Sequence, residues 1–475
     1  MSQNTANADL TLVQALSGFV ADVTFERLPQ EVSASVKQRV LDTIGICLAA
    51  SADRLADGVG DVIELWGGRE QSSVVLRPGR FPAPSAALFN GTLAHSLDFD
   101  DTHLPSVLHP SASVVPAALA MGEALSCSGQ DVIAAAAAGY EVCIRTGMAG
   151  YDPKLGNSVF FERGWHATSI CGALAAAALG AKLLGLGPEG IAHAMGIAAS
   201  MSSGLIESNR AGGSVKRLHC GWAAHSGLTA ALLAERGYTG PSTVFEGRFG
   251  FYAAYCDGQF DPIQITEGLG ERWCAPDIFF KPYPANHFTH AMIDAALALK
   301  RKFAVDVETI EEIELGAASA PLRTIGEPRE QKIRPQSGYH AQFSGPFAVA
   351  TALLGGSGLG VSFGDFTDEK VKDPAFLALA AKVRTFVDAE CERVFPNQFP
   401  AIVRLRLRSG EVLEERVMAN RGGPDNPLSD DELLLKFRLN AERSVAPAQA
   451  ERIAAAIMSM QRLERVGDIL ALARD

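Results

Sequence analysis

The chain has 475 residues, of which 47% are hydrophobic and 20% charged, with a formal net charge of −12 at pH 7. This is the composition of a globular protein of two or three domains, and it excludes a disordered chain. The negative charge argues against a nucleic-acid binder, because a protein that binds nucleic-acid phosphates needs a basic surface.

The eight cysteines are scattered, and none forms a C-x-x-C spacing typical of a zinc or redox site. Unpaired thiols in a large acidic chain fit a reducing compartment. Residues 1–9 lack the basic and apolar segments of a secretory signal. The most lipid-like stretch, 168–186, is interrupted by Lys182 and several glycines, which favours a helix buried in protein. We therefore expect a cytoplasmic protein with neither a membrane nor a nucleic-acid partner.

Helical spacing dominates the first half of the chain. Apolar residues recur at four-residue steps over 32–48, after a proline suited to a first helical turn. Ser128 can cap a further helix. Because no strand-like alternation separates the helical segments, we predict a large all-helical domain over residues 1–275.

The first group of polar residues with catalytic potential follows an Ala-rich helical stretch. Three carboxylates and two imidazoles stand within nine positions, and another imidazole follows shortly after. The residues of interest are His95, Asp98, Asp100, Asp101, Thr102, His103 and His109. A protein core would not accept so many polar groups unpaired. They could transfer protons, bind a divalent metal or cap a solvated helix end, and the residue types alone leave these readings open.

A second group, Arg163-Gly-Trp-His166-Ala-Thr-Ser169, stands directly before the apolar stretch. His166 lies where a loop becomes a helix start, a place where backbone amides favour anions. An imidazole there can titrate near neutral pH. The alternative is a histidine that only packs at a helix N-terminus.

A third group, Lys216, Arg217 and His219, follows the pair Gly212-Gly213. Three cationic or near-cationic side chains in an acidic chain suit a clamp for carboxylate or phosphate. A Walker-type loop is not indicated, because no Gly-Lys-Ser/Thr follows a strand. A basic surface turn is the alternative.

A fourth group, at residues 281–290, lies where the composition of the chain changes. It contains His287 and His290 in a His-x-x-His spacing. Clefts between domains are favoured positions for small-molecule sites. We expect His287 to face such a cleft and His290 to pack on its helix, with a metal site as the alternative.

The rest of the chain mixes strands and helices. The expected elements are strands at 310–315, 403–408 and 412–417, a turn at 409–410, and helices at 346–354 and 448–473. Ser429 and Glu432 form a capping-box pattern that begins a closing helix. We predict a smaller α+β domain over 276–429, with the helices of 430–475 returning to the first domain.

In this order, the four groups resemble the MmgE/PrpD family, which includes 2-methylcitrate dehydratase, cis-aconitate decarboxylase and iminodisuccinate epimerase. The resemblance extends from about residue 10 to 470. The pieces that carry it are Ala94-His-Ser-Leu-Asp98-Phe-Asp-Asp, His109-Pro-Ser, Gly164-Trp-His166-x-Thr-Ser, Lys216-x-Leu-His219-x-Gly and Ala231–Pro241.

The resemblance implies a mainly α protein with a large all-helical domain, a smaller α+β lid domain and a cleft between them. It also implies a homodimer and no iron–sulfur cluster. The positions that correspond to the active site are Asp98, Thr102, His109, His166, Lys216 and His287. Two features depart from the family. Phe347 stands where members often carry a tyrosine, and the spacing from Thr102 to His109 is slightly longer than in the decarboxylase.

We therefore expect a cofactor-independent lyase, a dehydratase acting on a small polycarboxylic acid such as 2-methylcitrate. Asp98, His109 and His166 would move protons next to a carboxylate. The expected substrate-binding residues are Thr102, Lys216, Arg217, His219 and His287, and neither a metal nor another cofactor is expected. A cis-aconitate-like decarboxylase or a dicarboxylate epimerase or isomerase could use the same groups. A metal-dependent hydrolase is a more distant alternative.

Overall fold

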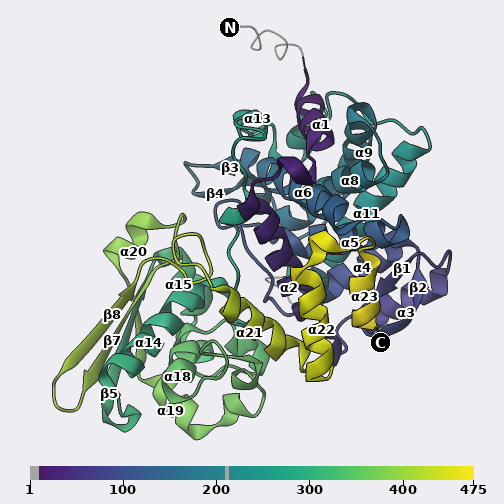
Figure 1. The fold of residues 1–475 in the computed structure, drawn as a ribbon. Helices are drawn as coiled ribbons and strands as arrows, with labels where there is room; N and C mark the ends of the chain where they lie inside the picture. Colours follow the sequence, from purple (N-terminus) through teal and green to yellow (C-terminus); the bar gives the residue numbers. More distant parts are fainter. Residues whose placement is uncertain (1–9, 209–212, 475) are drawn as a thin grey trace. The chain divides into compact units, whose positions relative to one another are not determined.

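The computed structural model describes residues 10–208 and 213–474, so Gly212 of the glycine pair lies outside the described residues. The chain divides into two compact units (Figure 1). Unit 1 comprises Met1–Ile278 and Phe437–Asp475, and unit 2 comprises Phe279–Lys436. The role of unit 2 as a lid stays a prediction.

Unit 1 consists mainly of helices. They are α1 (Leu12–Asp22), α2 (Gln30–Ala52), α3 (Asp57–Trp66), α4 (Ala83–His95), α5 (Ser111–Ala124), α6 (Gly129–Ala149), α7 (Val159–Glu162), α8 (Ala167–Leu183), α9 (Pro188–Met201), α11 (Val215–Glu235), α12 (Phe251–Cys256), α13 (Ile263–Thr266), α22 (Pro447–Met458) and α23 (Gly467–Arg474). The helices predicted after Pro29 and after Ser128 are confirmed as α2 and α6.

Two short antiparallel pairs of strands accompany these helices, β1 (Ser72–Val74) with β2 (Arg77–Phe81) and β3 (Tyr151–Asp152) with β4 (Asn157–Ser158). The prediction of a mainly α protein is confirmed, but that of an all-helical first domain is wrong. The strands are too short for alternation to be visible, and β2 contains Pro78 and Gly79, residue types that are depleted in strands.

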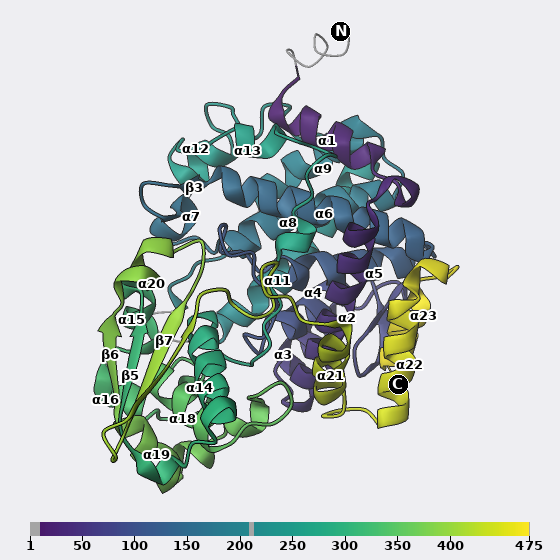
Figure 2. The same cartoon turned by 60° about the vertical axis from the view of Figure 1, so that its left-hand side comes forward.

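In unit 1, the Ala- and Gly-rich helix α11 packs against two other helices of this kind, α4 and α8 (Figure 2). A Cβ added to Gly91 of α4 would lie 2.7 Å from the Cα of Gly221 in α11. A Cβ added to Gly227 of α11 would lie 2.5 Å from the carbonyl oxygen of Ala173 in α8. Glycine at these positions therefore lets the helix backbones approach closely.

One helix among the described residues is long and apolar enough to cross a membrane, and it is α6 rather than the 168–186 stretch. Of the apolar window in α6, 94% is buried inside the protein. The 168–186 stretch forms most of α8, whose residues 167–181 are all buried. Both segments supply core helices of unit 1.

Unit 2 contains a four-stranded sheet in the order β6-β5-β7-β8. Its elements are α14 (His290–Phe303), β5 (Ile310–Ala317), α15 (Ser319–Ile325), α16 (Arg329–Ile333), α17 (Gly338–Ala341), α18 (Gly345–Leu354), α19 (Pro374–Ala381), β6 (Val383–Val387), α20 (Ala389–Val394), β7 (Ala401–Leu407) and β8 (Val412–Val417). The strands β5, β7 and β8 and the helix α18 confirm predictions. The parallel edge strand β6 was not predicted, because its five residues include the polar pair Arg384-Thr385.

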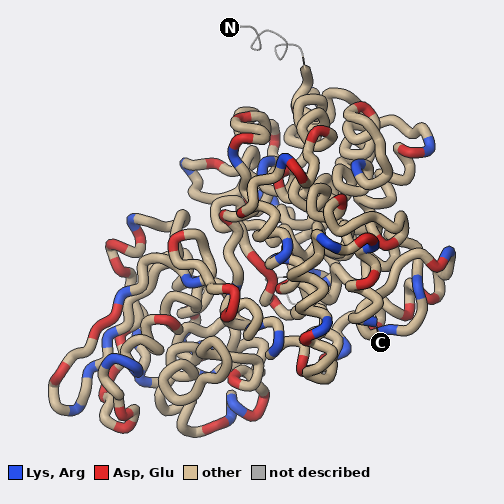
Figure 3. Tube along the Cα trace, in the orientation of Figure 1, with Lys and Arg blue, Asp and Glu red and all other residues tan. Residues whose placement is uncertain are grey.

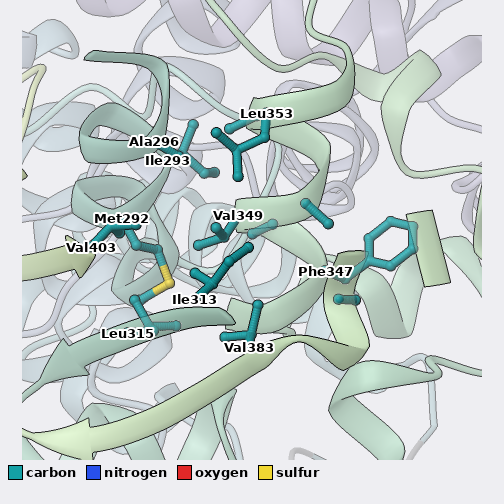
Figure 4. Close-up of a cluster of buried hydrophobic side chains, with 14 of the residues drawn as sticks. Met292, Ile293, Ala296, Ile313, Leu315, Phe347, Val349, Leu353, Val383 and Val403 are labelled. Carbon is teal, nitrogen blue, oxygen red and sulfur yellow. The ribbon is translucent and has the colours of Figure 1, made fainter. Parts of the chain in front are cut away.

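The hydrophobic core of unit 2 lies between its sheet and the helices α14 and α18 (Figure 4). Phe347 is completely buried there, and its ring packs 5.9 Å from that of Phe376. Charged residues alternate along the strands (Figure 3), for example Arg404, which pairs with Glu314 and Glu414. This alternation explains why β7 was visible in the sequence.

Near the C-terminus, α21 (Asp430–Ala441) begins with the predicted capping box. The Ser429 amide donates to Glu432, and the Glu432 amide donates to the Ser429 hydroxyl. The single helix predicted over 448–473 is wrong, because the chain breaks between α22 and α23. There the Gly129 amide donates to the carbonyl of Leu463. The segment between α22 and α23 thus accepts a hydrogen bond from the start of α6, and the helix does not continue through it.

Candidate active site

The segment after α4 brings a carboxylate to a lysine that is distant in sequence. Asp98 has φ +52°, a left-handed conformation that aspartate tolerates better than most residues, and the chain turns sharply there. Lys216 Nζ, in the first turn of α11, donates to Asp98 Oδ1 at 3.3 Å. Their side chains are 25% and 10% exposed, respectively. Two predicted site residues therefore form one largely buried ion pair.

Four imidazoles gather next to this pair, and we call His95, His109, His166 and His219 the imidazole cluster. The His95 ring lies 5.4 Å from that of His109 and 5.5 Å from that of His166, measured between centroids. The rings of His166 and His219 are 5.0 Å apart. They come from the end of α4, the loop before α5, the start of α8 and the first turns of α11.

His166 and His219 are joined through their Nδ1 atoms, which lie 2.9 Å apart. A hydrogen bond between two ring nitrogens needs a proton on one of them and a lone pair on the other. A neutral imidazole carries one proton in total, so the donor ring has a lone pair at Nε2 and the acceptor ring has an N–H there. If both rings are neutral, their two Nε2 atoms present one proton acceptor and one proton donor.

The surroundings favour the neutral form of both rings. Burial lowers the pKa of His166 well below its usual range, and the neighbouring His95, Lys216, His219 and His109 lower it further. Burial, together with His95 and Lys216, lowers the pKa of His219 to about 4. Both shifts favour uncharged rings at neutral pH.

His109 is held in one tautomer. Its Nδ1 lies 2.7 Å from the backbone carbonyl oxygen of Asp101, which can only accept, so the proton of a neutral His109 is on Nδ1. Thr102 Oγ1 lies 3.3 Å from the same nitrogen. The backbone amide of His109 donates to Thr168 Oγ1 of α8 at 3.2 Å. In the neutral ring, Nε2 is then a lone-pair acceptor.

A separate polar network lies next to the cluster, and we call Arg39, Asp101, Ser111 and Tyr140 the polar floor. Arg39 of α2 pairs with Asp101 at 3.3 Å, and both side chains are almost completely buried. The Ser111 hydroxyl donates to Asp101 and lies 2.7 Å from the Tyr140 hydroxyl. Burial raises the pKa of Asp101 to about 6, against the opposing effects of Arg39 and Ser111.

The sequence placed His95 and Asp100 in the first polar group, but neither was assigned a catalytic or a binding role. His95 Nδ1 lies 2.6 Å from Asp100 Oδ2, and the two side chains are 0% and 3% exposed. The signal that could have identified them is their spacing within the His-Ser-Leu-Asp-Phe-Asp motif, because the left-handed residue between them folds Asp100 back onto the end of α4. His103, in contrast, contacts Ser106 at 2.6 Å within its own loop.

The remaining predicted site residues lie outside these contacts. Arg217 lies beside Lys216 on α11 and is half-buried, and its side chain makes no hydrogen bond or ion pair with the described residues. His287 belongs to unit 2, where its ring lies 4.8 Å from His290 and 5.5 Å from Phe399. Its substrate-binding role stays a prediction. Over residues 10–208 and 213–474, no group of three or more His, Cys, Asp or Glu side chains could hold a metal ion.

Comparison with protein families gives two matches that together span most of the chain. The model of the MmgE/PrpD N-terminal domain matches residues 14–263. The model of the MmgE/PrpD C-terminal domain matches residues 283–462. The first match contains the whole imidazole cluster and the Asp98–Lys216 pair.

Three curated relatives, two of them named for cis-aconitate decarboxylase, are similar to this chain. The chain is 29% identical to the cis-aconitate decarboxylase-like protein oryM of Aspergillus oryzae, over 96% of each chain. It is 27% identical to the cis-aconitate decarboxylase of Mus musculus, over 98% of this chain and 93% of that one. It is also 27% identical to the 2-methylcitrate dehydratase of Cupriavidus necator, over 61% of each chain.

Proposed function

Because this chain belongs to the MmgE/PrpD family, we propose that it is a lyase of small polycarboxylic acids that transfers protons through its imidazole cluster. The observation that carries this proposal is the bond between His166 and His219. A neutral, hydrogen-bonded pair offers an acceptor and a donor side by side, as lyase chemistry next to a carboxylate requires. The identity of the substrate and the bond that breaks belong to the proposal.

The Asp98–Lys216 pair supports the binding of an anion. In an acidic chain, a polycarboxylate is repelled at long range unless local cations compensate. Lys216 is held close to the imidazoles by Asp98, and a substrate carboxylate could share or replace that contact through a charge-assisted hydrogen bond. Such a carboxylate would also raise the proton affinity of His166, which makes the ring a better base only once substrate is present.

The first candidate reaction is dehydration of a hydroxy acid such as 2-methylcitrate. A lone-pair nitrogen, at His166 or His109, takes the proton from the carbon next to a carboxylate. The electron pair of that C–H bond forms the carbon–carbon double bond, and the C–O bond to the neighbouring hydroxyl breaks. The N–H partner protonates the departing hydroxyl, so water leaves, and Lys216 stabilises the charge that develops on the carboxylate.

The second candidate reaction is decarboxylation of an unsaturated tricarboxylate such as cis-aconitate. It is favoured by a specific observation, since the decarboxylase relatives align along nearly the whole chain, whereas the dehydratase aligns over 61%. Here the bond between the carbon skeleton and a carboxylate carbon breaks, carbon dioxide leaves, and the electron pair of that bond stays on the carbon skeleton. The N–H of the imidazole pair then protonates the skeleton carbon that carries this electron pair. The buried Phe347 has no hydroxyl, so it cannot be the donor.

Incubation of the purified chain with 2-methylcitrate, citrate, cis-aconitate and iminodisuccinate, followed by mass analysis, tests the proposal. A loss of about 18 mass units, which is water, identifies a dehydratase, and a loss of about 44 mass units, which is carbon dioxide, identifies a decarboxylase. An unchanged mass with altered stereochemistry identifies an epimerase. We expect one acid to be converted by the wild-type chain and not by His166→Ala. Conversion of none of these acids or their close analogues would contradict the proposal.

A further inference from the structure

Two buried hydroxyl groups stand shortly after His166, and the proposed reaction does not use them. They belong to Thr168 and Ser169 in the first turn of α8, and the two residues are 0% and 1% exposed. A buried hydroxyl group needs a hydrogen-bond partner, and within helices it often finds one on a carbonyl of its own helix. Here both hydroxyl groups contact other elements of unit 1.

Each of these hydroxyl groups contacts the backbone of a residue that carries another ring of the imidazole cluster. Thr168 Oγ1 accepts a hydrogen bond from the backbone amide of His109 at 3.2 Å. Ser169 Oγ donates to the backbone carbonyl oxygen of His219 at 3.0 Å. The start of α8 therefore carries His166 and also contacts the backbones of His109 and His219. Three of the four rings of the cluster are connected through this one helical turn.

The start of α8 is itself held in place, as a turn that positions other residues must be. The backbone amide of His166 donates to the carbonyl oxygen of Gly204 at 2.9 Å. Gly204 has φ +136°, a conformation that favours glycine, and it lies close against the turn. A Cβ added to Gly204 would lie 2.9 Å from the Cβ of Ser169, which is closer than such atoms approach. The segment at Gly204 thus packs tightly on the residues that bear the two hydroxyl groups.

We propose that Thr168 and Ser169 are positioning residues, whose hydroxyl groups hold the backbones of His109 and His219 at fixed distances from His166. The Nδ1 atoms of His166 and His219 lie 2.9 Å apart, and they share a proton only while the two backbones keep this spacing. A misplacement of about 1 Å can cost about 10²-fold in rate. The inference rests on the proposed function for its purpose, but the Nδ1 contact can be measured without substrate.

The first arm of the test compares Ser169→Ala with Ser226→Ala in the full chain. Ser226 is a matched control, because it is equally buried and its hydroxyl donates to the carbonyl of Ala223 within α11. In protein with isotope-labelled histidine, NMR detects the coupling between two ring nitrogens across a shared proton, and no substrate is needed. We expect this coupling between His166 and His219 in the wild-type chain and in Ser226→Ala, and its loss in Ser169→Ala.

The second arm compares Thr168→Val, which keeps the shape of the side chain and removes the hydroxyl, with Thr168→Ser, which keeps the hydroxyl. Thr146→Val is the matched control, because Thr146 is equally buried and its hydroxyl donates to the carbonyl of Val142 within α6. For the acid that the wild-type chain converts, we expect kcat to fall about 30-fold in Thr168→Val, with KM changed less than about twofold. Thr168→Ser should recover most of kcat, and Thr146→Val should retain it.

Unchanged coupling in folded Ser169→Ala, its absence from the wild-type chain, or equal losses of kcat in Thr168→Val and Thr146→Val would overturn the inference. If one of the two variants does not fold, the other decides. If neither folds, the hydroxyl groups serve the fold alone and the inference fails. A chain with the expected coupling in each variant but no activity on any polycarboxylate would refute the proposed function alone. An active chain in which neither coupling nor kcat responds would refute this inference alone.

Discussion

The polar floor and the imidazole cluster are neighbouring groups of buried polar residues, and the short segment after α4 contributes residues to both. They differ in how their carboxylates are paired. Asp101 is surrounded by fixed partners, since Arg39 and Ser111 both bind its carboxylate. Asp98, three residues earlier, pairs with Lys216, whose side chain is a quarter exposed. The first pair is almost completely buried, whereas the lysine of the second reaches solvent, where a ligand could contact it.

This difference suggests that the polar floor serves mainly stability and the imidazole cluster mainly the proposed chemistry. A fully paired buried network is costly to break because the remaining charge is left without a partner. A cluster of neutral imidazoles contributes little charge pairing to the fold, but it offers protons and lone pairs at one place. We therefore expect substitutions in the two groups to have opposite profiles of stability and turnover.

The largest effect is expected from His166→Ala. Removal of one member of a proton-transferring pair should lower turnover by about 10³-fold, within the range for general acid–base catalysis, while the unfolding temperature changes little. Asp98→Asn, which loosens the hold on Lys216, should lower turnover by no more than Lys216→Ala does. Measured turnover and thermal unfolding of each variant check this. Near-normal turnover in His166→Ala would show that His166 is not in the proton path.

In the polar floor, Arg39→Met should have the reverse profile. It leaves the buried Asp101 carboxylate without its cation, which should cost at least about 3 kcal/mol of unfolding free energy. Turnover of the protein that remains folded should fall much less than in His166→Ala. Urea unfolding and activity at low temperature test this expectation. A variant that is stable but inactive would place Arg39 in the chemistry instead.

A smaller effect is expected from Lys216→Ala, which removes the cation proposed to bind substrate. Loss of one partner of a carboxylate costs about 2–5 kcal/mol, and the partial exposure of Lys216 favours the lower end of this range. A cost of about 2 kcal/mol corresponds to a loss of kcat/KM of roughly 30-fold. Lys216→Arg should recover only part of the lost kcat/KM, because a planar guanidinium group replaces the compact ammonium group. Substrate affinity should also weaken as salt rises. Unchanged kinetics in Lys216→Ala would identify the segment as a basic surface turn.

The smallest expected effect concerns the pH dependence of stability. The pKa of His219 is about 4 in the folded chain and about 6.5 when unfolded. The unfolded state therefore binds more protons between these values, and the contribution of His219 is lost as the pH falls from 6.5 to 4. Unfolding free energies at pH 7 and pH 4.5 should differ by about 1 kcal/mol less in His219→Gln than in the wild-type chain. An equal pH dependence in both would contradict the neutral state of this ring.

The sequence allowed much of the fold to be predicted, and it singled out several residues that the structure places in the candidate site. Four-residue spacing identified α2 and α6, and alternation identified β7 and β8. The family motifs singled out Asp98, His109, His166 and Lys216, which the structure brings together. The short strands of unit 1 and the break between α22 and α23 were missed, because tertiary hydrogen bonds rather than residue pattern determine them.

The contacts within the candidate site could not be predicted in the same way. The Nδ1 contact between His166 and His219 joins residues 53 positions apart and depends on how closely α8 and α11 pack. The His95–Asp100 contact depends on the left-handed conformation of Asp98, a feature that spacing alone does not reveal. Residue types show which groups are available, and only packing determines which of them share a proton.

Solvent hydrogen exchange at the substrate tests the central claim most directly. The substrate identified by mass analysis is incubated in D₂O with the wild-type chain, with His166→Ala and with His103→Ala as a matched buried histidine, and the carbon next to the carboxylate is followed by NMR. We predict that deuterium enters that carbon, in substrate or product, with the wild-type chain and with His103→Ala, and about 10³-fold more slowly with His166→Ala. Equal exchange with all three chains would contradict proton transfer by the imidazole cluster.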